Sequence, residues 1–198
     1  LAKSGLETTV AMTTHVVGPF HLAGALRLDP AEVGLVMSTG PLAAALAGVP
    51  AGRAIDRFGA ARATLAGLVA MAMGCLALSI IPASCGIWGY IAPLVVLTAG
   101  FATFQAANNT AVVNGVEAGE RGVVSGMLGL SRNLGLVTGA SAMGAVFSLT
   151  ASMGSIGSSR AEAIASGTRS TFAVAVVLVF AALMLALRGA RGARGREP

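Results

Sequence analysis

The sequence contains few charged, aromatic and cysteine residues. Of its 198 residues only 11% are charged and 5% are aromatic, whereas 55% are hydrophobic and the mean hydropathy is +0.81. An average soluble domain carries about 25% charged residues. The scarcity of charge therefore excludes an ordinary soluble fold, and the long apolar segments indicate an all-α membrane protein.

The chain also lacks the residue patterns of a catalytic or metal centre. It has no paired carboxylates, no spaced cluster of histidine and cysteine, and no phosphate-binding loop. Cys75 and Cys85 are too few for a disulfide framework, and a helical rise of about 1.5 Å per residue separates them by about 15 Å, so both are expected to be free thiols. We expect no catalytic residue, no metal, no cofactor and no enzymatic activity.

Six apolar segments are long enough to cross a bilayer, for which about 20 helical residues are needed. They cover residues 7–26, 30–51, 61–81, 88–113, 122–149 and 170–187. The second segment has the sharpest start, because Asp29, Pro30 and Glu32 supply an N-cap, a first-turn proline and a first-turn acid. Residues 152–168 are rich in serine and glycine and predict a mobile loop, with a short helix over 160–166 as a variant.

Lysine and arginine are distributed unevenly between the ends of these segments. Apart from Arg132, nine lie on one side and three on the other. Because cytoplasmic loops are enriched in positive charge, the side with nine is predicted to be cytoplasmic, together with both termini and the basic tail 188–198. This topology accounts for the net charge of +5, so we expect the lipid bilayer as a partner and no nucleic acid. Trp88 and Tyr90 are predicted to lie at the outer interface.

A short polar stretch, Gly52–Arg62, connects the second and third segments. Gly52 and Gly59 are expected to let the backbone reverse. Asp56 can accept N–H groups from a neighbouring helix start or pair with an arginine, and either interaction can lock one conformation. Alternatively, these charges only anchor the loop in water. The candidate conformational gate comprises Gly52, Asp56, Arg57, Gly59 and Arg62.

Six polar side chains lie inside the apolar segments, where such groups usually face a cavity or a partner. These candidate pathway residues are His15, Gln105, Asn108, Asn109, Arg132 and Asn133. The amides Gln105, Asn108 and Asn109 share one helical face, which favours a wet cavity wall or, alternatively, hydrogen bonds between helices. His15 precedes Pro19 by four residues and is either a ligand or proton site or a structural hydrogen-bonding group.

Arg132 is the most informative of these residues. It lies eleven residues beyond Arg121, about 16 Å into the membrane, which is too deep to reach the surface easily. Every acid of the chain, Glu7 included, is placed at or beyond the end of a segment. The counter-charge is therefore expected from a missing part of the protein, a substrate or water, and Asn133 is expected to help bind the guanidinium.

The stretch Gly52–Arg62 resembles the cytoplasmic loop motif of the major facilitator superfamily. Gly52, Asp56, Arg57 and Gly59 match that motif, although two alanines precede Arg62 where the family usually has basic residues. The other stretches that carry the resemblance are 104–110, 121–126 and 131–135. The whole is most similar to the multidrug:proton antiporter branch.

The resemblance implies that the chain is the C-terminal six-helix bundle of a two-bundle transporter. Such a protein would export small drug-like or amphipathic molecules by alternating access, coupled to protons, in the bacterial inner membrane. Its partners would be a small-molecule substrate and the missing N-terminal half, a helix of which Asp56 would hold in the outward-open state. The coupling carboxylate is expected on that half. Alternatives are a sugar or metabolite exporter of the same superfamily, and a six-helix channel or scaffold that acts as an oligomer.

Overall fold

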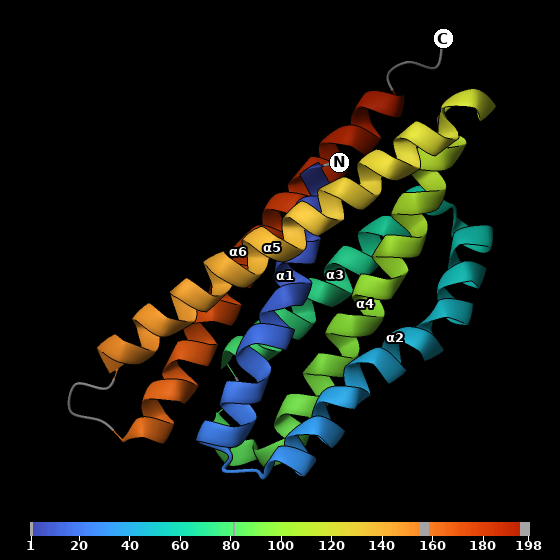
Figure 1. The fold of residues 1–198 in the computed structure, drawn as a ribbon. Coiled ribbons are helices and arrows are strands. Elements are labelled where there is room, and N and C mark those ends of the chain that lie inside the picture. The colour runs from blue at the N-terminus through green and yellow to red at the C-terminus, as the bar shows by residue number, and fades with distance from the viewer. Residues whose placement is uncertain (1, 81, 155–158, 195–198) are drawn as a thin grey trace.

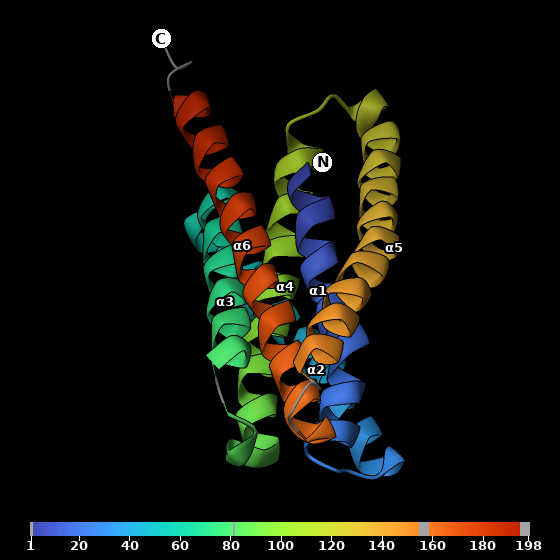
Figure 2. The same cartoon turned by 90° about the vertical axis from the view of Figure 1, so that its left-hand side faces the viewer.

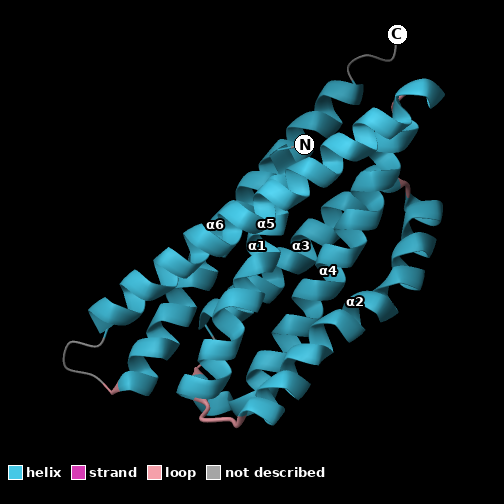
Figure 3. Cartoon of the chain, in the orientation of Figure 1, coloured by secondary structure: helices cyan, strands magenta, loops and turns pink. Residues whose placement is uncertain are grey.

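The computed structural model describes residues 2–80, 82–154 and 159–194, which form helices and connections without any strand (Figures 1 and 3). The long helices are α1 (Ala2–Phe20), α2 (Pro30–Phe58), α3 (Ala60–Ile80), α4 (Gly86–Asn114), α5 (Arg121–Gly154) and α6 (Arg160–Arg194). Short helical turns follow α1, α3 and α4, namely η1 (His21–Ala25), η2 (Ala83–Cys85) and η3 (Ala118–Glu120). The prediction of an all-α fold is confirmed.

Local chemistry sets both ends of α2. At its start Asp29 Oδ1 accepts the Glu32 N–H at 2.8 Å and Glu32 Oε2 accepts the Asp29 N–H at 3.0 Å, which completes a capping box. At its end the reversal into α3 takes place at Gly59, whose φ of +85° suits glycine. The expectation that Gly52 also opens the turn is wrong, because the helix continues through Gly52 to Phe58.

The range 152–168, predicted to be a mobile loop, is helical at residues 152–154 and 160–168, which includes the short helix predicted over 160–166, while residues 155–158 lie outside the described residues. α5 continues to Gly154, and α6 begins at Arg160 rather than near residue 170. The reason is a second reciprocal cap, in which Glu162 Oε2 accepts the Ser159 N–H at 3.0 Å and Ser159 Oγ accepts the Glu162 N–H at 3.3 Å. This cap and the following helix outweigh the serine and glycine content of the segment.

α1 begins earlier than the apolar pattern suggested. It starts at Ala2, so Glu7 lies more than one turn inside the helix instead of at its border. Beyond Pro19, which has no N–H to donate to the fourth carbonyl before it, the backbone widens into the π-helical turn η1. The first segment is therefore one nearly continuous helix, with an irregular last turn.

The helices form a bundle in which α1 occupies the centre (Figures 1 and 2). α1 packs against α5 and α6, α3 packs against α4 and α6, and α2 lies at the edge beside α4. α3 and α4 lie in close contact, because a Cβ at Gly67 would lie 2.6 Å from the Phe104 nitrogen and one at Gly74 would lie 2.7 Å from Leu97 Cβ. Glycine at these positions lets the two backbones touch.

Five of the long helices, α2 to α6, are long and apolar enough to cross a membrane. α1 falls short of that composition because it carries several threonines as well as Glu7. Its polar side chains are covered by the surrounding helices instead of by lipid: Ser4, Glu7, Thr8, Thr13 and Thr14 are each at most 2% exposed. The central position of α1 thus explains how a less apolar helix is accommodated.

Two smaller predictions have different outcomes. Cys75 is buried in α3 and Cys85 is exposed, and both are free thiols as expected. Trp88 is 78% exposed at the end of the bundle that carries Pro82, whereas Tyr90 is only 2% exposed. Tyr90 does not face outward as Trp88 does, because its ring packs inward against His21.

Candidate functional site

The charges of the candidate gate lie at the corner between α2 and α3. Asp56, Arg57 and Arg62 are all exposed, and the Arg57 guanidinium lies 5.4 Å from the centre of the Phe58 ring. Within the described part of the chain no hydrogen bond or ion pair engages Asp56. The gate residues are thus presented outward at one end of the bundle, the Gly59 end, where the first residues of α1 and α5 also lie (Figure 1).

The amide side chains of Gln105, Asn108 and Asn109 on α4 do not line one common surface. Asn108 is 4% exposed and its Nδ2 donates to Ser4 Oγ of α1 at 3.0 Å. Asn109 Oδ1, one residue further, accepts a hydrogen bond from Arg132 Nη2 of α5. Gln105 is half-buried. Asn108 and Asn109 therefore connect α4 to two different helices, which agrees with the alternative of interhelical hydrogen bonds.

Arg132 is the centre of a polar cluster between α1, α4 and α5. Its Nη2 donates to Asn109, while its Nε is buried and has no hydrogen-bond acceptor among the described residues. Asn133 is exposed, so the guanidinium is bound by Asn109 and not by Asn133 as predicted. This difference arises because consecutive residues of a helix point about 100° apart.

Glu7 of α1 belongs to the same cluster, which the sequence did not indicate. Its side chain is 1% exposed, neither carboxylate oxygen has a hydrogen-bond partner among the described residues, and Arg132 is the charge that attracts it most strongly, followed by Lys3. The expectation that Glu7 lies at the border, and that no acid of this chain is near Arg132, is therefore wrong. The available signal was the spacing of Ser4, Glu7 and Thr8, which places three polar residues on one helical face.

His15 lies on another part of α1, two turns beyond Glu7, or about 12 Å along the helix axis. Its Nδ1 is 3.2 Å from the Ala11 carbonyl oxygen and 3.3 Å from Thr14 Oγ1. The exposed ring lines a cavity of about 140 Å³ between α1, α2 and α4. The other residues that line this cavity are Ala11, Thr14, Met37, Gly40, Pro41, Ala44, Leu94, Leu97, Thr98 and Phe101.

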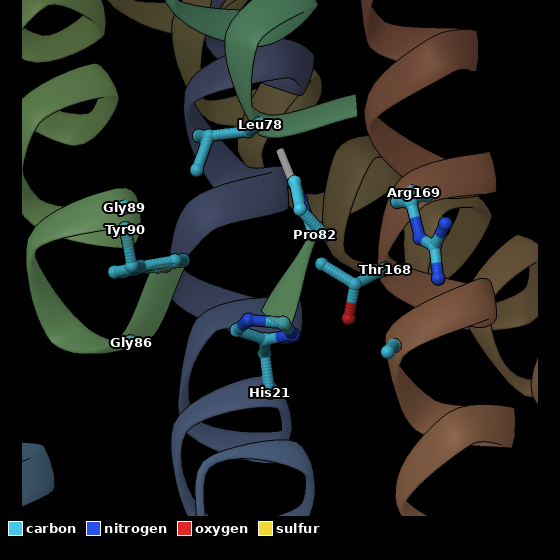
Figure 4. A pocket seen from close by; sticks show the side chains of 9 residues that line it. His21, Leu78, Pro82, Gly86, Gly89, Tyr90, Thr168 and Arg169 are labelled. Carbon is cyan, nitrogen blue, oxygen red and sulfur yellow. The ribbon is translucent and has the colours of Figure 1, made fainter. Parts of the chain in front are cut away.

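A second, much smaller pocket lies at the opposite end of the bundle (Figure 4). His21 stacks on Tyr90 with ring centres 5.7 Å apart, and the pocket beside them is lined by Pro82, Thr168 and Arg169. Its volume of about 10 Å³ is that of a single water molecule. It is too small for an organic ligand, unlike the cavity of about 140 Å³ beside His15.

Metal ligands do not gather anywhere in the described ranges, where no group of three or more His, Cys, Asp or Glu side chains comes together. The polar chemistry of this bundle consists of the exposed gate charges, the cluster around Arg132 and the mainly apolar cavity beside His15. These features lie along α1, α2, α4 and α5 and at the first turn of α3, which carries Arg62.

Comparison with known proteins adds to this geometry. The family model of the Major Facilitator Superfamily matches residues 6–198. The chain is 36% identical over 122 residues to the uncharacterized transporter YebQ of Escherichia coli (strain K12), an alignment that covers 62% of this chain and 27% of that protein. It is 31% identical over 127 residues to the multidrug efflux pump LfrA of Mycolicibacterium smegmatis (strain ATCC 700084 / mc(2)155), covering 64% of this chain and 25% of that protein.

Among solved structures, the chain resembles a crystal structure of the nucleoside transporter NupG with a TM-score of 0.75 and 18% identity, over 93% of this chain and 46% of that one. At this identity the likeness concerns the fold alone. The chain spans about a quarter of the length of the curated relatives it matches. Both relatives are named as transporters, in line with the expectation that the protein is not an enzyme.

Proposed function

The chain belongs to the Major Facilitator Superfamily, and we propose on this basis that it is the C-terminal half of a proton-coupled exporter of small amphipathic or drug-like molecules. In such a protein two six-helix bundles rock around a site near the middle of the membrane. The similarity to a named multidrug efflux pump supports the substrate class.

The cavity between α1, α2 and α4 is the observation that carries this proposal. Its volume of about 140 Å³ and its lining by Met37, Leu94, Leu97 and Phe101 suit an apolar molecule, while His15 offers a polar ring at its wall. Pockets for organic ligands are commonly apolar with a few polar groups that orient the ligand. A sugar requires more hydrogen-bonding groups than this lining supplies, so export of an amphipathic compound fits better. A cavity of this size in one half accommodates part of a ligand, and the partner half supplies the rest.

The surfaces of α2 and α5 support the presence of a second half. Both helices expose large apolar side chains at the edge of the bundle, among them Leu42, Leu46, Leu130 and Leu134, each at least 57% exposed. An N-terminal bundle would cover part of these surfaces and lipid the remainder. In this arrangement the Gly59 end, which carries most of the basic residues, faces the cytoplasm of a bacterial inner membrane.

Asp56 acts in this proposal as part of the cytoplasmic gate. It is exposed at the Gly59 end and is not engaged within the described half, so its carboxylate is free to accept N–H groups from a helix of the other bundle. Arg57, Arg62 and the turn at Gly59 hold the corner at which this contact forms. Breaking and remaking the contact once per cycle would favour each conformation in turn.

Filling the cavity tests the proposed substrate site. In the full-length protein Gly40→Leu places a side chain into the cavity, because a Cβ at Gly40 meets only the ordinary contacts of Thr98 and Leu94 at 3.5 and 4.0 Å. Gly48→Leu on the same helix is the control, since no atom lies within 4 Å of its added Cβ. Cells that express the protein are loaded with ethidium, and its efflux is followed by fluorescence.

We expect Gly40→Leu to lose ethidium efflux and Gly48→Leu to keep it, with equal amounts of both proteins in the membrane. Efflux by Gly40→Leu at the wild-type rate would refute the assignment of this cavity. If the wild-type protein extrudes neither ethidium nor other lipophilic cations, the proposed substrate class is wrong.

A further inference from the structure

Glu7 combines features that a purely structural residue does not need. It is 1% exposed at the centre of the bundle, and among the described residues neither of its oxygens is hydrogen-bonded. A buried ionised carboxylate without partners costs several kcal/mol, and the group avoids this by taking up a proton or by pairing with a cation. Glu7 therefore has two acceptable states, and which one it adopts depends on Arg132.

Arg132 has matching features. Its Nη2 is held by Asn109 of α4, while its Nε is buried and has no acceptor among the described residues. A guanidinium has five N–H donors in a fixed plane, so one that is bound on one side still offers donors on the other. This Nε donor is unused among the described residues, and Glu7 of α1 is an acid on which the charge of Arg132 acts.

The surroundings of this pair contain few other charges. Lys3, one turn earlier on α1, is the next cation that acts on Glu7. The facing segments of α4 and α6, residues 86–114 and 170–187, contain no acidic, basic or histidine residue. The charge of the cluster is therefore set mainly by whether Glu7 holds a proton.

We propose that Glu7 carries a coupling proton in this half of the transporter, and that Arg132 changes partner with the charge of Glu7. While Glu7 is protonated, Arg132 binds Asn109, as in this structure. When the carboxyl group releases its proton to water, the resulting carboxylate accepts hydrogen bonds from Arg132. The hydrogen bond from Arg132 to Asn109 is then broken. This inference rests on the proposed transport function. It places a coupling carboxylate in this chain, in addition to any coupling carboxylate on the N-terminal half.

The change of the Arg132 partner from Asn109 to Glu7 couples protonation of Glu7 to the packing of the helices. With Glu7 protonated, the cluster keeps the net positive charge of Arg132, which favours an arrangement that admits water. With Glu7 ionised, the two charges cancel, and the cluster is compatible with closed, dry packing. The same exchange moves a hydrogen bond from the α4–α5 contact to the α1–α5 contact, so protonation biases how α5 packs.

A cavity near Glu7 can hold the water that accepts its proton. A cavity of about 210 Å³ at the Gly59 end is lined by Lys3, Thr64 and Asn108. Asn108 bonds Ser4, which lies one helical turn before Glu7. Proton release toward this cavity requires passage of only about one turn, or roughly 5 Å, along α1.

The test uses the purified full-length protein in liposomes of phosphatidylethanolamine and phosphatidylglycerol. Dicyclohexylcarbodiimide adds to protonated carboxyl groups in apolar surroundings, and mass spectrometry of the peptides locates the adduct. We expect labelling of Glu7 that declines as the pH rises. Arg132→Gln should extend labelling to higher pH, because the carboxylate loses its counter-charge. Exposed Glu120 serves as the control carboxyl and should remain unlabelled.

Transport is measured on the same liposomes with ethidium as the probe. Glu7→Gln should lose accumulation driven by a pH gradient and keep exchange of ethidium for ethidium at equal pH, whereas Glu7→Asp should retain part of the driven transport. Glu120→Gln should behave as the wild type. This split separates a coupling role from a structural one, since a misfolded variant loses both activities.

Two results would overturn the inference: absence of labelling at Glu7 at every pH, or driven accumulation by Glu7→Gln at the wild-type level. Failure of the proposed function is distinguishable from these. If the wild type moves no ethidium while Glu7 is labelled with the expected dependence on pH and on Arg132, the protonation site is supported and the proposed substrate class is wrong.

Discussion

Replacing Gly135 with alanine tests whether close contact of α1 and α5 holds the centre of the bundle together. A Cβ at Gly135 would lie 2.5 Å from the Gly5 carbonyl oxygen and 3.0 Å from the Gly5 Cα. Ordinary contact begins near 3.5 Å, so the two helices have to separate by about 1 Å. The Thr9 hydroxyl, which donates to the Gly135 carbonyl at 3.1 Å, lies at the same contact.

The expected magnitude follows from two opposing effects. Overpacking of this kind costs about 1–3 kcal/mol, and because both partners are backbone, neither can move aside by changing rotamer. Alanine favours the helix over glycine by about 1 kcal/mol. We therefore expect a net loss of about 1–2 kcal/mol in the free energy of unfolding.

The control is Gly129→Ala in the same helix, where no atom lies within 4 Å of the added Cβ. It gains the helix propensity without the clash and is expected to be as stable as the wild type or slightly more stable. Unfolding of the purified full-length protein is followed by circular dichroism in mixed micelles with increasing sodium dodecyl sulfate. Equal midpoints for Gly135→Ala and Gly129→Ala would refute the argument from close packing.

Two further predictions concern the ends of α2. Asp29→Ala removes the capping box and should lower stability by about 1 kcal/mol in the same titration, whereas Asp29→Asn keeps a side-chain acceptor and should lose little; equal losses for both variants would contradict the role of the cap. Asp56→Asn should insert at the wild-type level and lose ethidium export, because a neutral amide binds N–H groups of a helix start more weakly than a carboxylate does. Export at the wild-type rate would contradict the gate, and Glu120→Gln, exposed at the same end, controls for general loss of charge.

Several features could be predicted because they depend on neighbouring residues. The capping box at Asp29 and the reversal at Gly59 each follow from residues within one helical turn. The same local chemistry explains why α6 begins at Arg160 and not near residue 170, because the Ser159 and Glu162 pair caps the helix there. A reciprocal cap of this kind can be recognised in a sequence.

The polar residues show where prediction from sequence stops. Spacing placed Asn108 and Asn109 on one face of α4, but they bind Ser4 and Arg132 on two different helices. Hydropathy placed Glu7 at the border of a segment, because an acid normally marks the edge of an apolar run. Its burial was not predictable in this way, since the helices that cover it are distant in sequence.

Hydropathy and capping act over a few residues, so the sequence alone predicts a set of membrane-length helices and the start of α2. That Arg132 binds Asn109, and that its charge acts on the buried Glu7, depends on how α1, α4 and α5 pack. The approach of α1 to α5 is set by glycines such as Gly135 that leave room for a neighbouring backbone. Contacts of this kind decide whether a buried charge has a partner. They join residues that are distant in sequence, so local sequence patterns do not predict them.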